Sequence, residues 1–164
     1  MPDAKSWLMM VDSEFVAPKG GAATFDPTGF GLMSARMAKT IGVHDGGGRI
    51  LNSEGQVNEK EAFCKPARWC DYSGRLTSDA DGFAGILLMN HPRNPNHPTA
   101  FHVRDDGWMC SCLSLEKPVP VDDRTPLHVR FALWVHQGVP VAVRCEAMWR
   151  SFAEFPMPDM NKKP

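Results

Sequence analysis

The chain has 164 residues, which suits one domain that removes roughly 70% of its unfolded surface from water. Hydrophobic residues make up 43% of the sequence and charged residues 23%, with 18 basic against 19 acidic side chains. This near-neutral balance disfavours binding to nucleic acid, because phosphate contacts need a basic excess or a basic stripe. The sequence also lacks a run of about eighteen uncharged apolar residues, so no membrane span is predicted.

The use of cysteine, glycine and proline narrows the compartment and the fold class. The five cysteines are irregularly spaced and no Asn-x-Ser/Thr glycosylation acceptor occurs, which indicates a reducing environment. Residues 1–10 contain no apolar secretion signal, so a cytoplasmic location is expected. Fourteen glycines and fourteen prolines are typical of a sheet protein with many turns. We therefore predict an all-β fold, an antiparallel β-sandwich with one C-terminal helix, in a single domain over residues 1–164.

Strands are predicted where apolar residues alternate with polar ones or run together between turn signals. In chain order they are expected at 6–16, 30–37, 67–72, 83–89, 101–104 and 128–136. Segment 83–89 is apolar on both faces, which is typical of a central strand. Segment 67–72 alternates like a strand with one solvent-exposed face, and Ser73-Gly74 should end it.

Tight turns and one long loop are predicted between these strands. The triple glycine at 46–48 indicates a turn, and it lacks the Lys-Ser/Thr of a phosphate-binding loop. Residues 52–55 indicate a second turn. Residues 90–99 contain three prolines, which cannot donate to a sheet ladder. This segment is therefore predicted to be an ordered loop.

One helix is predicted at 141–154, after Pro140. Five apolar residues recur there at helical spacing and form one stripe: Val141, Cys145, Met148, Trp149 and Phe152. Glu146 and Arg150 are expected on the opposite, solvent-exposed face. Residues 156–164 are predicted to be a flexible tail.

Segment 91–105 holds most of the candidate chemistry. It contains His91, His97 and His102, and the prolines after the first two restrict the loop. In an extended strand, His102 and Arg104 share one face, which places a titratable base beside a permanent cation. We take these four residues as catalytic candidates, with His102 for proton transfer and Arg104 for holding an oxyanion or carboxylate. The structural alternative is hydrogen bonding to Asp105, or histidines that brace the loop through backbone carbonyls.

No cofactor is predicted. The histidines could bind a divalent metal together with Glu54 or Glu61, although their spacing matches no compact metal motif. Cys110 and Cys112 would share one face of a strand, but no second cysteine pair lies at a suitable spacing. Buried thiols are therefore expected there instead of a zinc site.

A second polar cluster combines aromatic rings with charged and amide side chains. A sugar-binding cleft needs such a combination, because a flat ring stacks on the sugar while forked donors and acceptors bind its hydroxyls. Trp69 could equally belong to the core, and Arg68 could simply form an ion pair with Glu61. The candidate substrate-binding residues are Asn52, Glu54, Glu61, Arg68, Trp69, Asp71, Tyr72 and Asp105.

Three stretches, 49–56, 65–74 and 90–105, together resemble the PmoA-like family of bacterial proteins in residues, order and spacing. The strand that ends at Val135-His136 and the helix with Glu146 and Trp149 are also similar to that family. The resemblance covers roughly residues 30–155. It implies a β-sandwich of the kind found in sugar-handling proteins, with a small sugar-like ligand as partner.

The resemblance also implies an open sheet edge. Family members are usually longer, so this chain is expected to lack strands of the sandwich and to cover the edge with a partner chain or a second copy. Two functions follow as hypotheses. The first is binding or processing of a sugar at a His/Arg-lined site, with Trp69 or Tyr72 as the stacking ring. The second is a non-catalytic binding or assembly module that keeps the family scaffold.

Overall fold

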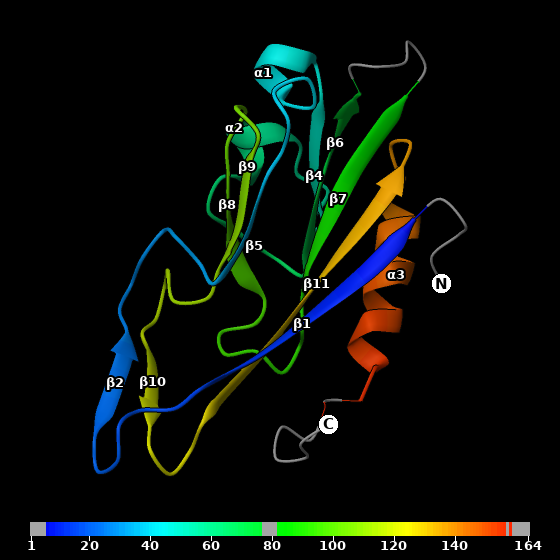
Figure 1. Cartoon of the computed structure of the whole chain (residues 1–164). Helices are drawn as coiled ribbons and strands as arrows, with labels where there is room; N and C mark the ends of the chain where they lie inside the picture. The colour runs from blue at the N-terminus through cyan, green and yellow to red at the C-terminus, as the bar shows by residue number, and fades with distance from the viewer. Residues whose placement is uncertain (1–5, 77–81, 157, 159–164) are drawn as a thin grey trace.

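A computed structural model describes residues 6–76, 82–156 and 158. These residues form two antiparallel sheets that face each other, a separate two-stranded ribbon, and a helix that covers the outer face of the larger sheet (Figure 1). The predicted all-β, sandwich-like fold with one C-terminal helix is confirmed. Within the described residues no helix is both long and apolar enough to cross a membrane.

The larger sheet has five strands in the order β1-β11-β7-β6-β4. Their bounds are β1 Trp7–Phe15, β11 Leu127–Gln137, β7 Phe83–Asn90, β6 Trp69–Arg75 and β4 Arg49–Asn52. As predicted, the continuous apolar segment β7 is the central strand. Leu88 on β7 pairs with Leu133 on one side and Cys70 on the other.

The smaller sheet has four strands in the order β3-β9-β8-β5, and the ribbon pairs β10 with β2. The sheet strands are β3 Met33–Arg36, β9 Trp108–Cys112, β8 Thr99–Val103 and β5 Lys65–Ala67. The ribbon strands are β2 Ala22–Phe25 and β10 Val119–Asp122, neither of which was predicted.

Two apolar layers hold the elements together. Between the sheets, Tyr72 and Leu88 pack against Phe101, Val103 and other side chains of the smaller sheet. On the other face of the larger sheet, helix α3 (Ala142–Glu154) packs on the strands. In this second layer the helix contributes Cys145, Met148 and Phe152. The strands contribute Trp69 and Trp134, among others.

Several local predictions are corrected. Segment 67–72 is two strands in different sheets, broken at Arg68, and β6 continues past Ser73-Gly74 to Arg75. Its supposed solvent-exposed face is buried under α3, since Trp69 and Asp71 are 1% and 2% exposed. The glycine-rich turn contains a short helix, α1 (Val43–Gly46), which ends where Gly47 adopts a φ of 66°. Of the predicted flexible tail, residue 157 and residues 159–164 lie outside the described residues.

Candidate functional site

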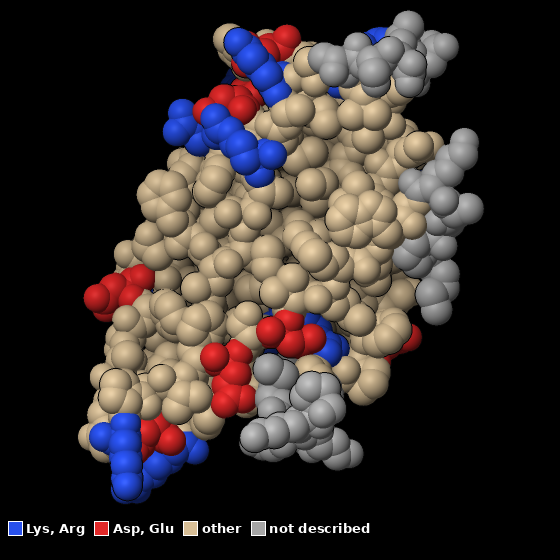
Figure 2. All heavy atoms as spheres, in the orientation of Figure 1, with Lys and Arg blue, Asp and Glu red and all other residues tan. Residues whose placement is uncertain are grey.

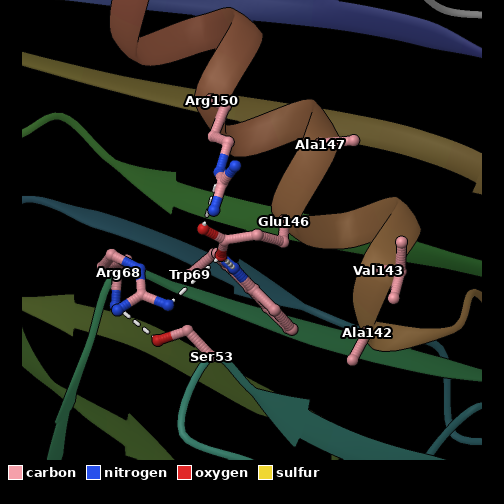
Figure 3. Close-up of a pocket in the computed structure, with 8 residues that line it drawn as sticks. All are labelled: Ser53, Arg68, Trp69, Ala142, Val143, Glu146, Ala147 and Arg150. Carbon is pink, nitrogen blue, oxygen red and sulfur yellow. Dashed lines mark hydrogen bonds and ion pairs between the residues drawn. The ribbon is translucent and has the colours of Figure 1, made fainter.

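A hollow of about 520 Å³ lies between the N-terminal half of α3 and the start of β6 (Figure 3). We call it the α3 hollow. Its size is within the range of small-molecule sites, which is roughly 300–1,000 Å³. It is lined by Ser53, Arg68, Trp69, Ala142, Val143, Glu146, Ala147 and Arg150.

Arg68 reaches the α3 hollow because the chain passes from the smaller to the larger sheet at this residue. Its backbone N–H donates to Ser53 Oγ at 2.9 Å, which fixes the loop on which it lies. Its guanidinium group donates to Glu54 Oε1 at 3.3 Å and to Glu146 Oε2 at 3.2 Å. The same group lies 5.5 Å from the ring centre of Trp149, a cation–π distance.

Glu146 accepts hydrogen bonds from several donor groups that line the α3 hollow. Its Oε2 also accepts from Trp69 Nε1 at 2.9 Å, and its Oε1 accepts from Arg150 Nε at 3.3 Å (Figure 3). Burial alone would raise the pKa of Glu146, but the hydrogen bonds from Trp69, Arg68 and Arg150 outweigh it and lower the pKa. Glu146 is therefore a carboxylate that orients donors. The predicted solvent-exposed face is confirmed for Arg150, whose side chain is 72% exposed, and only in part for Glu146, which is 24% exposed.

Three small aliphatic side chains of α3 also line the hollow. Ala142 and Val143 lie in the first turn of α3 and Ala147 lies one turn further along, and Val143 is 79% exposed. Trp69 contributes to the lining but is 1% exposed and Tyr72 is fully buried, so neither ring can offer a face for stacking. The placement of Trp69 in the core is confirmed, and its proposed stacking on a ligand is corrected.

Two of the three candidate histidines fasten the 90–99 loop to α3. His97 stacks on Trp149 with ring centres 6.0 Å apart and planes 7° apart, and the Trp149 indole donates to the Asn90 carbonyl at 3.0 Å. His91 is 2% exposed and meets Phe152 edge-on at 5.3 Å. Burial lowers the pKa of both histidines. This geometry matches the loop-bracing alternative more closely than catalysis.

The side chains of Asn52 and Glu61 accept hydrogen bonds from nearby backbone N–H groups. The Asn52 side chain accepts from the backbone N–H groups of Glu54 and Gln56 at 3.0 Å each, which stabilises the predicted turn. Glu61 belongs to helix α2 (Asn58–Ala62) and accepts from Val57 N at 2.9 Å. Glu61 and Arg68 therefore do not form the predicted ion pair, since Arg68 contacts Glu54 and Glu146 instead.

Tyr72 and Asp105 tie the two sheets together. The Tyr72 hydroxyl accepts from Val43 N and Gly107 N and lies 3.1 Å from the carbonyl oxygens of Arg104 and Asp105. The Asp105 carboxylate accepts from the backbone N–H of Glu59 at the start of α2. Both side chains are committed to internal hydrogen bonds.

Asp71 belongs to a buried hydrogen-bond network beneath α3. Its carboxylate accepts from the Ser73 hydroxyl and lies 2.7 Å from His136 Nε2. Burial raises the pKa of Asp71, although His136, Ser73 and Arg49 oppose the rise. The pair crosses β7 at Gly85, where a Cβ atom would lie 2.5 Å from Ser73 Oγ and 2.9 Å from His136 Cε1. The hydrogen-bonded side chains of Asp71, Ser73 and His136 are therefore enclosed by the protein.

His102 and Arg104 share one face of the smaller sheet, as predicted, and line a second hollow of about 180 Å³ with Phe30, Arg36 and Trp108. We call it the outer hollow. The His102 Nδ1–H donates to the Gly29 carbonyl at 2.7 Å, which leaves Nε2 as the free ring nitrogen. Arg36 and Arg104 both contact Asp106, at 3.3 and 3.7 Å.

Of the candidate residues, only Arg68 and Trp69 line the α3 hollow and only His102 and Arg104 line the outer hollow. Phe101 and Val103 of β8 point into the layer between the sheets, so His102 faces away from the larger sheet, whereas the α3 hollow lies beyond that sheet. Two sheets, normally about 10 Å apart, separate the hollows, so one sugar ring cannot contact both. Across 6–76, 82–156 and 158, no three His, Cys, Asp or Glu side chains are grouped as metal ligands.

Sequence reasoning missed the three other polar residues of the α3 hollow, Ser53, Glu146 and Arg150. The i,i+4 spacing of Glu146 and Arg150 was visible, but only the tertiary structure brings Arg68 and Trp69 to the same carboxylate.

Fold and site together define an all-β, sandwich-like protein with a ligand-sized hollow between a helix and a sheet. The chain belongs to a family of unknown function, DUF6807, whose family model matches residues 1–150. No curated protein and no solved structure matches the chain. These findings do not link it to the PmoA-like family specifically, so that finer resemblance stays a prediction.

Proposed function

We propose that the protein binds a sugar-like ligand in the α3 hollow. The observation that carries this proposal is the convergence of two guanidinium groups and a carboxylate beside three small aliphatic side chains, within about 520 Å³. A sugar ring has the matching surface, because its hydroxyl groups need forked donors and acceptors while its C–H faces need apolar contact.

The charges in and beside the hollow favour a neutral ligand. Arg68 and Arg150 are balanced by Glu54 and Glu146, to which they are linked at 3.2 to 3.3 Å. A charged ligand would have to displace one of these partners. The hydroxyls of a neutral sugar can instead use the remaining N–H groups and carboxylate lone pairs.

The ligand class is supported by the sequence resemblance as well as by the hollow. The PmoA-like family is similar to β-sandwich sugar-handling proteins, and stretch 65–74, which carries part of that resemblance, contains Arg68 and Trp69. Binding is favoured over turnover at this place, because Glu146 accepts three hydrogen bonds and its pKa is lowered. A general base would need a carboxyl with a raised pKa.

Isothermal titration calorimetry with a panel of neutral monosaccharides and disaccharides tests the proposal. Arg150→Ala should weaken binding about tenfold or more, because a hydrogen bond from a charged group contributes roughly 1.5–3 kcal/mol. Its stability should change little, since the side chain is 72% exposed. Arg104→Ala, in the outer hollow, is the matched control and should bind normally. The absence of binding by any sugar, or equal binding by Arg150→Ala, would contradict the proposal.

A second candidate function is proton transfer by His102. It is favoured by the hydrogen bond from Nδ1 to Gly29, which presents Nε2 beside Arg104. Incubation of keto sugars in deuterated water, followed by NMR, would detect exchange of the proton next to the carbonyl. His102→Asn can keep the bond to Gly29 but removes the base, so it should abolish exchange that Arg150→Ala retains. No exchange with the unaltered protein would rule out this function for the sugars tried.

A further inference from the structure

Strand β1 forms an open edge of the larger sheet. It pairs with β11 on one side through nine register positions, Trp7↔Val135 to Phe15↔Leu127, and no strand formed by the described residues lies on its other side. Among the described residues no hydrogen bond from outside this pairing reaches the β1 backbone. About half of its backbone N–H and C=O groups therefore point away from the sheet.

The opposite edge of the same sheet is covered. At β4, the Ile50 N–H donates to Asn58 Oδ1 at 3.0 Å, and the Asn52 N–H donates to the Gln56 carbonyl at 3.2 Å. Leu51 also forms a bridge to Val57. Residues 56–58 thus protect one edge, whereas no segment in the part of the chain that the structure describes covers β1 in this way.

Exposed apolar side chains accompany the open edge. Trp7, Met9 and Met10 are 56%, 41% and 38% exposed. Natural edge strands are usually protected by lysine, proline, bulges or short length, whereas β1 has nine residues and contains neither lysine nor proline. In Figure 2 the upper middle of the face on which β1 lies carries no charged side chains, which lie above it, at the left edge and across its lower third.

One of the two acidic residues of β1 is paired with a permanent cation within the sheet. Asp12 forms a two-point ion pair with Arg130, at 2.6 and 3.2 Å, and Glu14 lies 3.7 Å from His128. Only Glu14, whose histidine partner is charged only when protonated, can present a free charge on this strand. We propose that β1 pairs antiparallel with β1 of a second copy of this chain, which joins two five-stranded sheets into one.

The sequence of β1 suits self-pairing in one register. A twofold axis through an antiparallel pair must relate a residue to its own copy, because hydrogen-bonded and non-hydrogen-bonded pairs alternate. An axis at Val11 pairs all nine residues and opposes Met10 to Asp12 and Leu8 to Glu14. An axis at Asp12 would oppose two Asp12 carboxylates, and an axis at Ser13 would oppose Asp12 to Glu14. Registers with the axis nearer the N-terminal end of β1 also oppose no like charges, but they pair fewer residues.

The Val11 register also places Trp7 opposite the partner's Phe15 at both ends of the interface. Aromatic cross-strand pairs are among the favourable ones in sheets. The exposed Trp7 ring would thereby gain a partner, and the free backbone groups of both edges would be satisfied.

The register gives a charge-specific test at position 10. Met10→Asp would oppose a new carboxylate to the partner's Asp12, whereas Met10→Lys would oppose an ammonium group to it. Both variants place one charge at the same 38% exposed site. Each change occurs twice across the twofold axis, so the dimer dissociation constants of the two variants should differ by about tenfold or more.

Light scattering coupled to size exclusion, over a dilution series, measures the outcome. The unaltered chain should dimerise, Met10→Lys should remain dimeric, and Met10→Asp should shift to monomer. Circular dichroism must show both variants folded, and Val143→Asp, on exposed α3, should leave the dimer unchanged. A monomer at every concentration, or folded Met10→Asp and Met10→Lys proteins that dissociate alike, would overturn the proposal. Titration of the same samples with sugars tests the proposed ligand binding separately, so a failure of dimerisation and a failure of sugar binding can be told apart.

Discussion

The three histidines near the proline-rich loop have three different environments. His91 is buried against Phe152, His97 stacks on Trp149, and His102 donates to Gly29 on the outer face of the smaller sheet. The prolines of segment 90–99 correctly indicated a loop, which carries His91 and His97, and His102 lies in β8 after it. The spacing of the histidines could not tell which rings would be buried, because burial depends on α3, about fifty residues further along the chain.

Stability should fall as the pH drops below about 6.5. Burial lowers the pKa of His91 and His97 in the folded protein from the 6.5 of the free side chain, and Arg130 and Arg68 add to the effect. The unfolded chain therefore binds protons first, which favours unfolding as the pH falls through this value. Chemical unfolding between pH 5 and 8 measures the slope.

His97→Phe is the control for this prediction. The phenyl ring can keep the stack on Trp149 but cannot titrate, so the dependence of the unfolding free energy on pH should become shallower. A stability that is flat, or that rises as the pH falls in both proteins, would show that the two rings are not responsible.

The buried Asp71–His136 pair and its neighbours leave no room for a side chain at Gly85. A Cβ atom there would lie 2.5 Å from Ser73 Oγ and 2.6 Å from the Tyr72 carbonyl oxygen. Gly85→Ala should therefore lower the free energy of unfolding by about 1–3 kcal/mol or more. Gly29→Ala is the comparison, since its Cβ would have one neighbour, at 3.6 Å. Denaturant unfolding that ranks the two variants equally would contradict this reading of the central strand.

At the scale of elements, α3 both covers the larger sheet and forms one side of the α3 hollow. Its apolar stripe was predicted from helical spacing, and Cys145, Met148 and Phe152 are buried as expected. Val141 belonged to the same predicted stripe, but it precedes the helix and is 67% exposed, so that part is wrong. Helical periodicity describes one helix, whereas burial also depends on how far the strands beneath it extend.

Phe152→Ala should test how strongly this helix is held. The ring is fully buried against His91 and the larger sheet, so its loss should cost about 3–5 kcal/mol in the free energy of unfolding. Val143→Ala, at a position 79% exposed, should change stability by no more than about 0.5 kcal/mol. Thermal and urea denaturation provide the measurement, and similar values for both variants would mean that α3 is not part of the cooperative core.

At the scale of the whole molecule, the larger sheet is the stable centre and the ribbon is peripheral. Strand β7 is paired on both sides, and its Leu87, Leu88 and Met89 are fully buried. The ribbon of β2 and β10 has two strands, and β2 is exposed at three of its four residues.

Hydrogen exchange should follow this difference. Amide protons of β7 should exchange near the rate of global unfolding, whereas those of β2 should exchange much faster through local opening. Mass spectrometry or NMR measures both in one sample. Equal protection of β2 and β7 would indicate that the ribbon folds as one unit with the sheets.

The sequence by itself determined the all-β class, the central position of β7, the one long helix and the proline-rich loop. These features follow from local periodicity and from the limits that proline places on hydrogen bonding. Only the tertiary structure decided that Arg68 and Glu146 meet, that His102 lies across two sheets from them, and that β1 is left open. These facts depend on strand order and on the crossing at Arg68, because pairing partners distant in the chain leave no periodic signal in the sequence.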